Sequence, residues 1–296
     1  MSDFILSCCS TADLSKEHLD SRNIKYICFH YELDGNSYLD DFGKTIPLNE
    51  FYKAMENGAE TSTSQVNISE YMEFFEPVLK EGKDILHICF SSGLSGSYNS
   101  AKNAANICQE RYPDRKIIVL DSLAASSGYG LLMDKAADLR DSGMDIDTLA
   151  DWVEKNKLRV HHWFFSTDLT FYIKGGRVSK TAGFVAGILD ICPLLHVDKE
   201  GHLIPMEKIR TKKKVKLQTL KKMKEFATGG EAYDEKVFIS NSACYEDAKE
   251  VAMMVEEAFP NMNGKVEIDD IGTVIGAHTG PGTVALFFWG KSREEE

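Results

Sequence analysis

The sequence predicts an α/β protein of two domains, with βαβ units around a parallel sheet at the N-terminus and an α+β domain at the C-terminus. Apolar runs of strand length alternate with helical patterns as far as residue 158. Beyond that point the expected strands are longer and have fewer helices between them. With 296 residues, the chain is also long enough to bury two cores. We therefore expect domains at residues 1–158 and 159–296.

The N-terminal domain is expected to follow the βαβ order, in which ligands bind at the carboxyl ends of the strands. A hairpin near residues 31–44, which contains the turn pair Asp34-Gly35, is expected to leave the main sheet. A helix over 147–157 should lead out of the domain. The other expected strands lie at 4–6, 26–31, 85–90 and 117–120, and the other helices at 48–57, 68–81, 96–111 and 128–142.

The C-terminal domain is expected to contain a sheet with few helices between its strands. Within it, a segment rich in cations runs from Lys208 to Lys224. This segment is either a solvated helix face or a surface that docks an acidic partner or steers an anionic ligand. The expected strands are 162–166, 194–197, 236–240, 266–271 and 284–289.

Composition restricts the partners and the location of the chain. With 34 basic and 46 acidic residues, the formal net charge of -12 argues against binding to nucleic acid. No apolar run approaches the roughly 20 residues that span a bilayer, so we expect no stable membrane insertion. The first residues form neither a basic start nor a long apolar stretch, which makes a cytoplasmic location the default expectation.

The cysteines and histidines do not form a metal-binding pattern. The chain has seven cysteines, an odd number, with no CxxC pair and no histidine at ligand spacing. We interpret them as reduced core residues. His161 and His162 are adjacent on an expected strand and should point to opposite faces, which argues against a shared metal. We expect no metal and no cofactor.

A loop of small residues after an expected strand is the strongest candidate for an anion site. Residues 91–97, Ser-Ser-Gly-Leu-Ser-Gly-Ser, follow an apolar run and precede an expected helix. Backbone N–H groups and serine hydroxyls at a helix N-terminus can hold a carboxylate or a phosphate. The alternative is an ordinary turn with a serine that caps the helix.

Three further segments could join this loop at one cleft. Residues 61–65, Thr-Ser-Thr-Ser-Gln, are expected to lead into the helix at 68–81, with one hydroxyl as its N-cap and the others free, since capping requires fewer; the alternative is a plain polar loop. His278 is expected on a glycine-rich loop, where a neighbouring carboxylate would favour its protonated form and raise its pKa. Arg177 either forms a local salt bridge, holds the domains together or faces an anionic ligand. Each segment could also be a plain turn.

Two enzymatic readings find little support in the motifs. The serines of the 91–97 loop do not have the G-x-S-x-G spacing of a hydrolase nucleophile elbow. A phosphate-binding G-x-x-x-x-G-K-[ST] loop does not occur in the sequence. A serine hydrolase of acyl or phosphate esters remains as the alternative, with Ser95 or Ser92 as the nucleophile and His278 as the base.

Six short motifs occur along the chain in this order: 10–13 (Ser-Thr-Ala-Asp), 63–65 (Thr-Ser-Gln), 91–96, Asp121-Ser122, 174–179 (Lys-Gly-Gly-Arg-Val-Ser) and 276–282 (Gly-Ala-His-Thr-Gly-Pro-Gly). Taken together, these motifs resemble the DegV family of bacterial fatty-acid-binding proteins in order and spacing over essentially the full length. The sequence departs from the family pattern at Cys9, at Val66-Asn67 and at Cys192, which puts the acyl-chain preference and the pairing with a kinase in doubt.

The resemblance implies a non-catalytic protein that holds one long-chain fatty acid in a tunnel between its domains and presents it to a separate fatty acid kinase, which makes acyl phosphate for phospholipid synthesis. By the same resemblance, the carboxylate is bound by Thr63 and by a serine of the 91–95 loop, with His278 and Arg177 around them. Of the serines, Ser95 is the first candidate and Ser92 the second. The full set of implied ligand-binding residues is Thr63, Ser64, Ser92, Ser95, Gly96, Arg177, His278 and Thr279.

Burial of an acyl tail contributes about 0.8 kcal/mol per methylene group, so such binding should be tight. The candidate tunnel wall lies in the second domain, although the same apolar residues could form an ordinary filled core. These residues are Phe184, Val185, Ile188, Leu189, Ile191 and Leu194.

Overall fold

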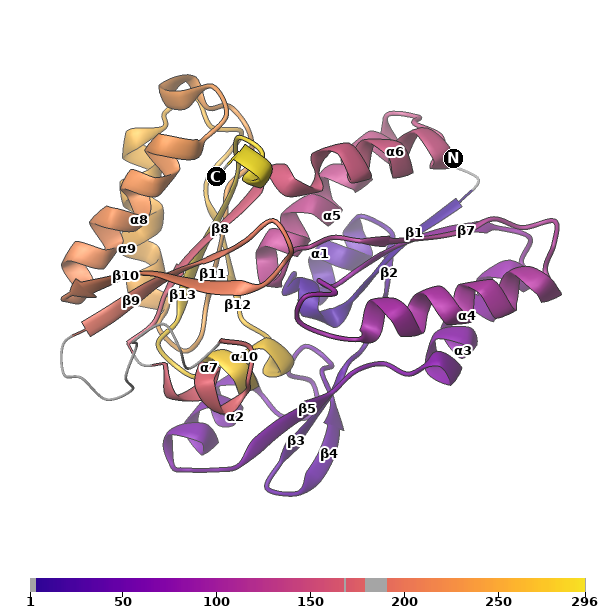
Figure 1. Cartoon of the computed structure of the whole chain (residues 1–296), viewed down its shortest axis with the longest axis horizontal. Helices are drawn as coiled ribbons and strands as arrows, with labels where there is room; N and C mark the ends of the chain where they lie inside the picture. Colours follow the sequence, from indigo (N-terminus) through magenta and orange to yellow (C-terminus); the bar gives the residue numbers. More distant parts are fainter. Residues whose placement is uncertain (1–3, 168, 179–190, 296) are drawn as a thin grey trace.

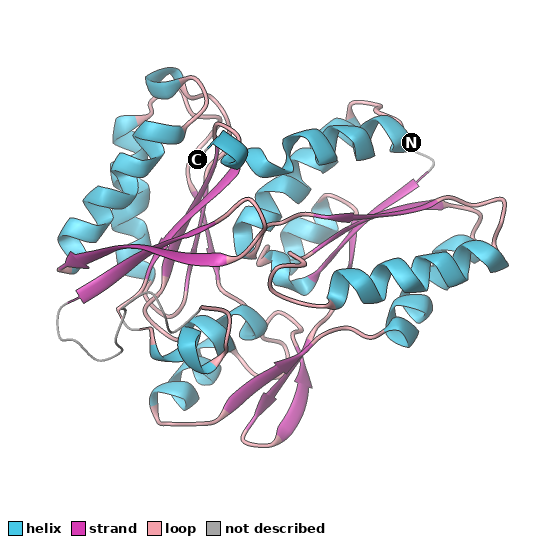
Figure 2. Ribbon diagram, in the orientation of Figure 1, coloured by secondary structure: helices cyan, strands magenta, loops and turns pink. Residues whose placement is uncertain are grey.

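Two large sheets and one small sheet organise the chain in the computed structural model, which describes residues 4–167, 169–178 and 191–295 (Figures 1 and 2). One large sheet belongs to the N-terminal part of the chain and is entirely parallel. The other belongs to the C-terminal part and is mixed. This is the mixed α/β architecture that the sequence predicts.

The parallel sheet has the strand order β2-β1-β6-β7. Helices cover both of its faces, with α3 and α4 packed together on one side and α5 and α6 on the other (Figure 1). The strands are β1 (Phe4–Cys9), β2 (Ile24–Ile27), β6 (Asp84–Cys89) and β7 (Ile117–Asp121). The helices are α1 (Lys16–Ser21), α3 (Ile68–Lys80), α4 (Ser97–Arg111), α5 (Ser126–Asp141) and α6 (Ile146–Asn156).

The hairpin predicted near residues 31–44 is present, but its strands form a separate three-stranded sheet. The single strand expected over 26–31 is therefore wrong. The chain leaves β2 at Ile27 and turns at Phe29, whose N–H donates to Ser10 Oγ (3.1 Å). The small sheet has the order β4-β3-β5, with β3 (His30–Leu33), β4 (Asn36–Leu39) and β5 (Thr61–Ser64), and α2 (Leu48–Glu56) connects β4 to β5.

The C-terminal sheet has the order β10-β9-β8-β13-β11-β12, with α8 and α9 against its outer face (Figure 1). Strand β10 was not predicted, because it is a partly exposed edge strand in which charged residues and a proline interrupt the apolar pattern. The strands are β8 (Val160–Phe165), β9 (Ile191–Val197), β10 (Leu203–Arg210), β11 (Phe238–Asn241), β12 (Glu267–Asp270) and β13 (Val284–Trp289). The helices are α7 (Thr170–Lys174), α8 (Lys212–Phe226), α9 (Tyr245–Ala258) and α10 (Thr273–Thr279).

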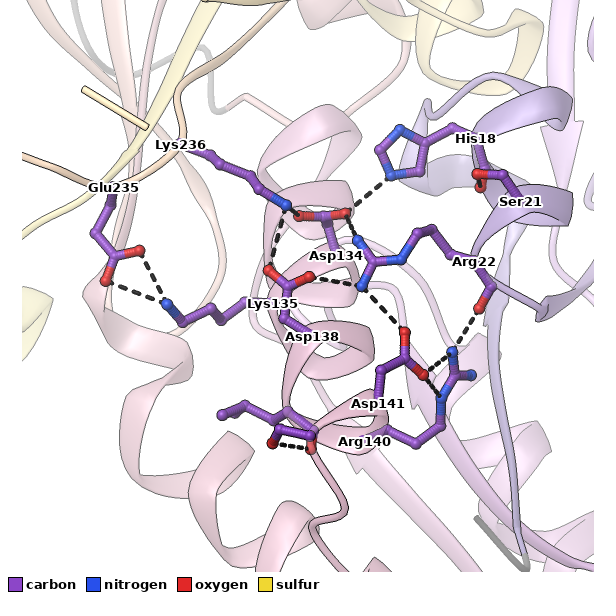
Figure 3. A network of polar contacts seen from close by, with 12 residues as sticks. His18, Ser21, Arg22, Asp134, Lys135, Asp138, Arg140, Asp141, Glu235 and Lys236 are labelled. Atoms are coloured by element: carbon purple, nitrogen blue, oxygen red, sulfur yellow. Dashed lines mark hydrogen bonds and ion pairs between the residues drawn. The ribbon is translucent and has the colours of Figure 1, made fainter. Parts of the chain in front are cut away.

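Helix α5 joins the two large sheets, because it contacts β8, β11 and β13 of the second sheet as well as the first domain. A polar network fixes this joint (Figure 3). The buried carboxylate of Asp134 on α5 binds His18 (3.0 Å), Arg22 (2.6 Å) and Lys236 (2.6 Å). Hydrogen bonds to Asp134 and Glu267 raise the pKa of His18 to about 9, so His18 is a cation within this network. The network ties α1, α5 and the C-terminal sheet together.

Five of the seven cysteines are buried, which confirms the prediction of core residues for those five, whereas Cys28 and Cys244 are partly exposed. Within the described part of the chain, none of the helices combines the length and the apolar character that a membrane span requires.

Candidate functional site

A cavity of about 380 Å³ is lined by residues from both parts of the chain. Its volume lies within the range of small-molecule binding sites. Polar groups gather from β5, the α4 N-terminus and α10, whereas most of the remaining wall is apolar. The polar lining comprises Thr63, Ser64, Gln65, Ser95, Ser126, His162, Arg177, His278, Thr279 and Thr283. The apolar lining includes Phe29, Phe90, Leu94, Phe164, Val197, Leu203, Val274 and Phe287.

The cavity brings together seven of the eight residues expected to bind a ligand: Thr63, Ser64, Ser95, Gly96, Arg177, His278 and Thr279. Ser92 is the exception, because it is exposed and does not belong to the lining. Its backbone N–H donates to Asp121 Oδ1 (3.1 Å) at the end of β7, and this bond turns the chain away from the cavity. The roles of all eight residues in binding stay predictions.

Thr63 lies on a strand, and the N-cap of α3 is Asn67, so the expectation that a hydroxyl of residues 61–65 caps this helix is wrong, and so is the alternative of a plain polar loop. Thr63 is paired with Tyr31 of β3, and side chains along β5 alternate between the two faces of the small sheet. This alternation leaves Ser62 exposed, with its hydroxyl donating to Glu32 (2.8 Å), and turns Thr63 towards α10. A strand of hydroxyl residues lacks the apolar alternation by which a strand is usually predicted.

His278 lies in the last turn of α10, so its expected place on a glycine-rich loop is also wrong. Gly276 lies within this helix. A glycine is required there because a Cβ atom would collide with the Tyr52 hydroxyl. The helix ends at Gly280, whose positive φ of 70° stops it. The glycines of this segment thus permit close packing and termination of a helix.

The imidazole of His278 is neutral in this structure. Its Nε2 lies 2.7 Å from Thr63 Oγ1, and its buried Nδ1 has no hydrogen-bond partner among the described residues. Burial, with a smaller contribution from the Arg177 charge, lowers the pKa of His278 to about 4. The rise in its pKa expected beside a carboxylate stays a prediction, because none of the described side chains around it supplies that carboxylate.

Arg177 carries a positive charge that no described carboxylate neutralises. Its guanidinium donates to two backbone carbonyls, Leu94 O (3.3 Å) and Gly175 O (2.6 Å). Among the ion pairs formed by described residues, none includes Arg177, so the local salt bridge considered from the sequence is not formed. The guanidinium of this exposed residue is thus held beside the cavity by neutral acceptors.

The N-terminus of α4 contributes a second source of positive potential. Gly96 is the N-cap residue, and the first turn of the helix contains no acidic residue. Ser95 Oγ accepts a hydrogen bond from the Ser97 N–H (3.2 Å), so its own hydroxyl proton is directed elsewhere. The anion seat expected at this loop is therefore supported by Ser95, Gly96 and the helix dipole.

The predicted tunnel wall is only partly testable. Phe184, Val185, Ile188 and Leu189 lie outside the described residues. Ile191 and Leu194 are on β9 but do not belong to the described lining of the cavity. Among the described residues, the apolar wall includes Phe90 after β6, Phe164 on β8 and Phe287 on β13.

The two adjacent histidines of β8 point to opposite faces, as predicted. His161 stacks between Phe226 and Phe288 on the outer face. His162 faces the cavity, where its Nε2 accepts from the Ala125 N–H (3.2 Å) and its Nδ1 donates to Val160 O (3.1 Å). Burial lowers the pKa of His162 well below its usual value, so the cavity wall there is neutral.

A second and larger hollow, of about 740 Å³, lies at the other end of α10. Its lining is acidic, with only two lysines, Lys16 and Lys44, to balance the carboxylates. An anionic ligand would be repelled there. The acidic lining residues are Asp13, Glu17, Asp40, Asp41, Asp269 and Asp270.

The geometry provides neither a catalytic triad nor a metal centre in the first cavity. No hydrogen bond between described residues joins His278 to Ser95 or Ser92, and no described carboxylate orients its Nδ1. The group within the described ranges that could hold a metal is Asp198, Glu200 and His202, in the exposed turn between β9 and β10. The absence of metal, cofactor and catalysis stays a prediction.

Comparison with known proteins places this geometry in context. A family model described as "Uncharacterised protein, DegV family COG1307" matches residues 9–291. The DegV domain-containing protein CPE0026 of Clostridium perfringens is 36% identical over 99% of this chain and 100% of its own length. The hypothetical protein TM841 of Thermotoga maritima, whose structure revealed a fatty acid binding function, is 25% identical with a TM-score of 0.81, over 98% of this chain and 100% of that one.

A third comparison concerns the fold alone. The Fatty Acid Kinase (Fak) B3 protein of Streptococcus pneumoniae, solved with linoleic acid, is 21% identical to this chain and has a TM-score of 0.84. The match covers 98% of this chain and 100% of that one. The fold is therefore shared over nearly the whole length.

Proposed function

This chain belongs to the DegV family, and from that premise we propose that it binds one long-chain fatty acid in the cavity of about 380 Å³ between its domains. The observation that carries the proposal is the pairing, in one cavity, of an uncompensated guanidinium with a largely apolar wall. A ligand that suits both must have an anionic end and a long apolar remainder.

The carboxylate is held by Thr63, Ser95 and Arg177. Because His278 Nδ1 has no described acceptor, its proton is better placed on Nε2, where it donates to Thr63 Oγ1 (2.7 Å). The threonine hydroxyl is then free to donate its own proton to the carboxylate. Ser95 Oγ is placed in the same way, since it already accepts from Ser97 N–H (3.2 Å). His278 thus acts through Thr63.

The tail is buried against the apolar lining. Each methylene removed from water contributes about 0.8 kcal/mol, so a dozen of them contribute roughly 10 kcal/mol before association costs of about 4 kcal/mol or more. The neutral state of His162 suits this role, because a charge at the cavity wall would oppose burial of the tail.

The protein acts as a carrier and presents the acid to a separate fatty acid kinase in the cytoplasm. This part of the proposal rests on the family resemblance, supported by the fold shared with the Fatty Acid Kinase B3 protein. The lack of an oriented base beside Ser95 is consistent with a non-catalytic role.

The proposal is tested by native mass spectrometry of freshly purified protein, followed by titration with a long-chain fatty acid. We expect one co-purified acid and a loss of affinity in the Thr63→Val and Ser95→Ala double variant. Each lost hydrogen bond to a charged group costs roughly 1.5 to 3 kcal/mol. A clean ligand-free mass from a lipid-replete host, together with no binding in the titration, would contradict the proposal.

Ser62→Ala is the matched control for Thr63, because Ser62 lies next to it on β5 and faces the opposite side. This variant should retain full affinity. Ser92→Ala separates the two candidate serines and should also retain affinity, since Ser92 is exposed outside the cavity. Hydrolysis of p-nitrophenyl esters that disappears in Ser95→Ala would instead favour a hydrolase.

A further inference from the structure

Two buried carboxylates of the N-terminal domain meet the first turn of α10, whose last turn carries His278. Asp13 Oδ1 accepts from the Gly272 N–H (3.0 Å). Asp40 Oδ1 accepts from both the N–H (3.1 Å) and the hydroxyl (2.7 Å) of Thr273. We infer that Asp13 and Asp40 are positioning residues for the proposed headgroup site, because they fix the start of α10 and thereby the place of His278. This inference rests on the proposed function for the role of His278.

The start of α10 needs partners from elsewhere in the fold. Its N-cap residue is Gly272, which has no side chain to accept from the first N–H groups of the helix. Asp13 and Asp40 supply the missing acceptors across the domain boundary. The helix runs only from Thr273 to Thr279, so its rise from first residue to His278 is about 8 Å. A shift at one end of so short a rigid element moves the other end.

Gly272 is the position at which both carboxylates converge. A Cβ atom there would lie 2.9 Å from Asp13 Oδ1 and 3.2 Å from Asp40 Oδ1. The backbone φ of this residue is -66°, so the conformation itself would suit any residue. The glycine is therefore explained by the close approach of the two carboxylates and not by backbone freedom.

The carboxylates are themselves held in place. Asp13 Oδ2 accepts from the Ser126 hydroxyl (2.5 Å), and Asp13 O accepts from the Ser127 hydroxyl (2.9 Å), both at the start of α5. Asp40 is anchored through its own N–H, which donates to Phe29 O (2.9 Å). Ser126 and Phe29 both line the cavity. The clamp on α10 is thus built on the same walls that would surround the ligand.

The arrangement is costly, which is unusual for a simple helix cap. Asp13 and Asp40 are only 5% and 3% exposed, and no described lysine or arginine forms an ion pair with either. Burial raises the pKa of both carboxyls, and their proximity adds to the rise for Asp13. A single serine could cap a helix without this cost. Two converging acids fix its position in two directions.

The opposite end of α10 is held by the same domain. His278 Nε2 meets Thr63 Oγ1 of β5 at 2.7 Å. The helix follows β12 in the chain and so belongs to the C-terminal part, yet both of its ends are attached to the N-terminal part. These attachments explain how His278, from the C-terminal part, is held within hydrogen-bonding distance of Thr63, from the N-terminal part.

The test compares Asp13→Ala and Asp40→Ala with Asp13→Asn and Asp40→Asn. The asparagine side chain keeps a carbonyl acceptor, so we expect it to preserve the clamp, whereas alanine removes it. In the alanine variants, fatty acid affinity should fall at least tenfold. The NMR titration of the His278 imidazole in the folded protein should move upward from about 4 towards its usual value. The asparagine variants should restore both.

A purely structural role would lower the melting temperature but leave the folded protein with wild-type affinity and an unchanged His278 titration, and that result would overturn the inference. If an alanine variant does not fold, Thr273→Val against Thr273→Ser removes or keeps one bond of the clamp and gives the same readouts. Failure of the wild-type protein to bind fatty acid would overturn the proposed function alone, since the His278 titration still decides the positioning role.

Discussion

Two hollows of opposite charge adjoin α10. The hollow of about 740 Å³, lined by six acidic residues, reaches the N-cap residue Gly272. The cavity of about 380 Å³ is lined by helix residues from Val274 to Thr279 and by Arg177, whose charge no described carboxylate compensates. The larger hollow is therefore the poorer seat for a fatty acid headgroup. Charge, more than volume, distinguishes the two regions, since each has a buried polar atom without a described partner: Asp269 Oδ2 in the acidic hollow and His278 Nδ1 at the cavity.

The hydrogen bonding of side chains also differs between the first and the last turn of α10. The hydroxyl of Thr273, at the first position of α10, donates to Asp40 at 2.7 Å. The hydroxyl of Thr279, at the last position, is buried and has no hydrogen-bond partner among the described residues, and the same holds for Nδ1 of His278. Buried polar groups are rarely left unpaired unless a function requires it. The first turn of α10 is thus paired with Asp13 and Asp40, whereas two polar atoms in its last turn have no described partner, which suits the proposed headgroup site.

The largest expected effect is at Gly280, which terminates α10. Its φ of 70° and ψ of 174° lie in a region open only to glycine, and a Cβ atom would lie 2.1 Å from the Phe171 ring. Gly280→Ala should lower the free energy of unfolding by roughly 2 to 5 kcal/mol, from backbone strain and overpacking together. Chemical denaturation measures this loss.

Gly35→Ala is the matched control for backbone strain without collision. Gly35 also has a positive φ, of 78°, but no atom lies within 4 Å of its added Cβ. Its cost should be the strain alone, about 1 to 3 kcal/mol. Equal losses in the two variants would show that the Phe171 contact does not constrain the end of α10.

Arg177 should account for most of the difference in anion affinity between the two hollows. Arg177→Gln removes the charge and keeps part of the hydrogen bonding, and we expect fatty acid affinity to fall about 10- to 150-fold, equivalent to roughly 1.5 to 3 kcal/mol. Isothermal titration with a long-chain acid measures the change. Lys174→Gln removes a nearby exposed cation outside the described lining and should have little effect. A similar loss in both variants would indicate general electrostatic attraction.

The parallel sheet and the strand–loop–helix order around residues 91–97 could be predicted because apolar runs and such an order are local signals, whereas the anion seat there stays a prediction. The strand at Thr63 and the helix at His278 could not, because tertiary contacts decide them: pairing with Tyr31 in one case, packing against Tyr52 in the other. The positions of Phe90 and Phe287 on the cavity wall likewise depend on which strand ends meet, which no local pattern encodes. Asp13 was noticed within a motif, but its contact with Gly272 spans 259 positions.

His278 and Asp269, one beside each hollow, should make the stability of the protein depend on pH in opposite directions. His278 has a folded-state pKa of about 4, below its usual 6.5, so the unfolded chain binds a proton that the folded protein does not. Stability is then lost as the pH falls from 6.5 to 4. Asp269, on the wall of the acidic hollow, has a pKa raised by burial and Glu267 to about 7, so its stability contribution is lost as the pH rises from 4 to 7.

Each residue should contribute a slope of up to about 1.4 kcal/mol per pH unit, with opposite signs. Chemical denaturation at several pH values between 4.5 and 6.5 gives the free energy of unfolding as a function of pH. Relative to wild type, the slope of this plot should become more negative in His278→Asn and more positive in Asp269→Asn. Differences from wild type cancel the contribution of the other carboxylates. Slopes that change in the same direction in both variants would refute the contrast between the two ends.

The smallest effect distinguishes the two threonines of α10. Thr279→Val removes a buried hydroxyl that has no partner among the described residues, and we expect the ligand-free protein to become about 1 kcal/mol more stable. Thr273→Val removes a hydroxyl bonded to the buried Asp40 and should destabilise by roughly 1.5 to 3 kcal/mol. If Thr279 contacts the headgroup, its valine variant should also bind fatty acid several-fold more weakly while being more stable. Loss of stability in Thr279→Val would mean that this hydroxyl is already satisfied without a ligand, and that the unpaired polar atoms do not mark the site.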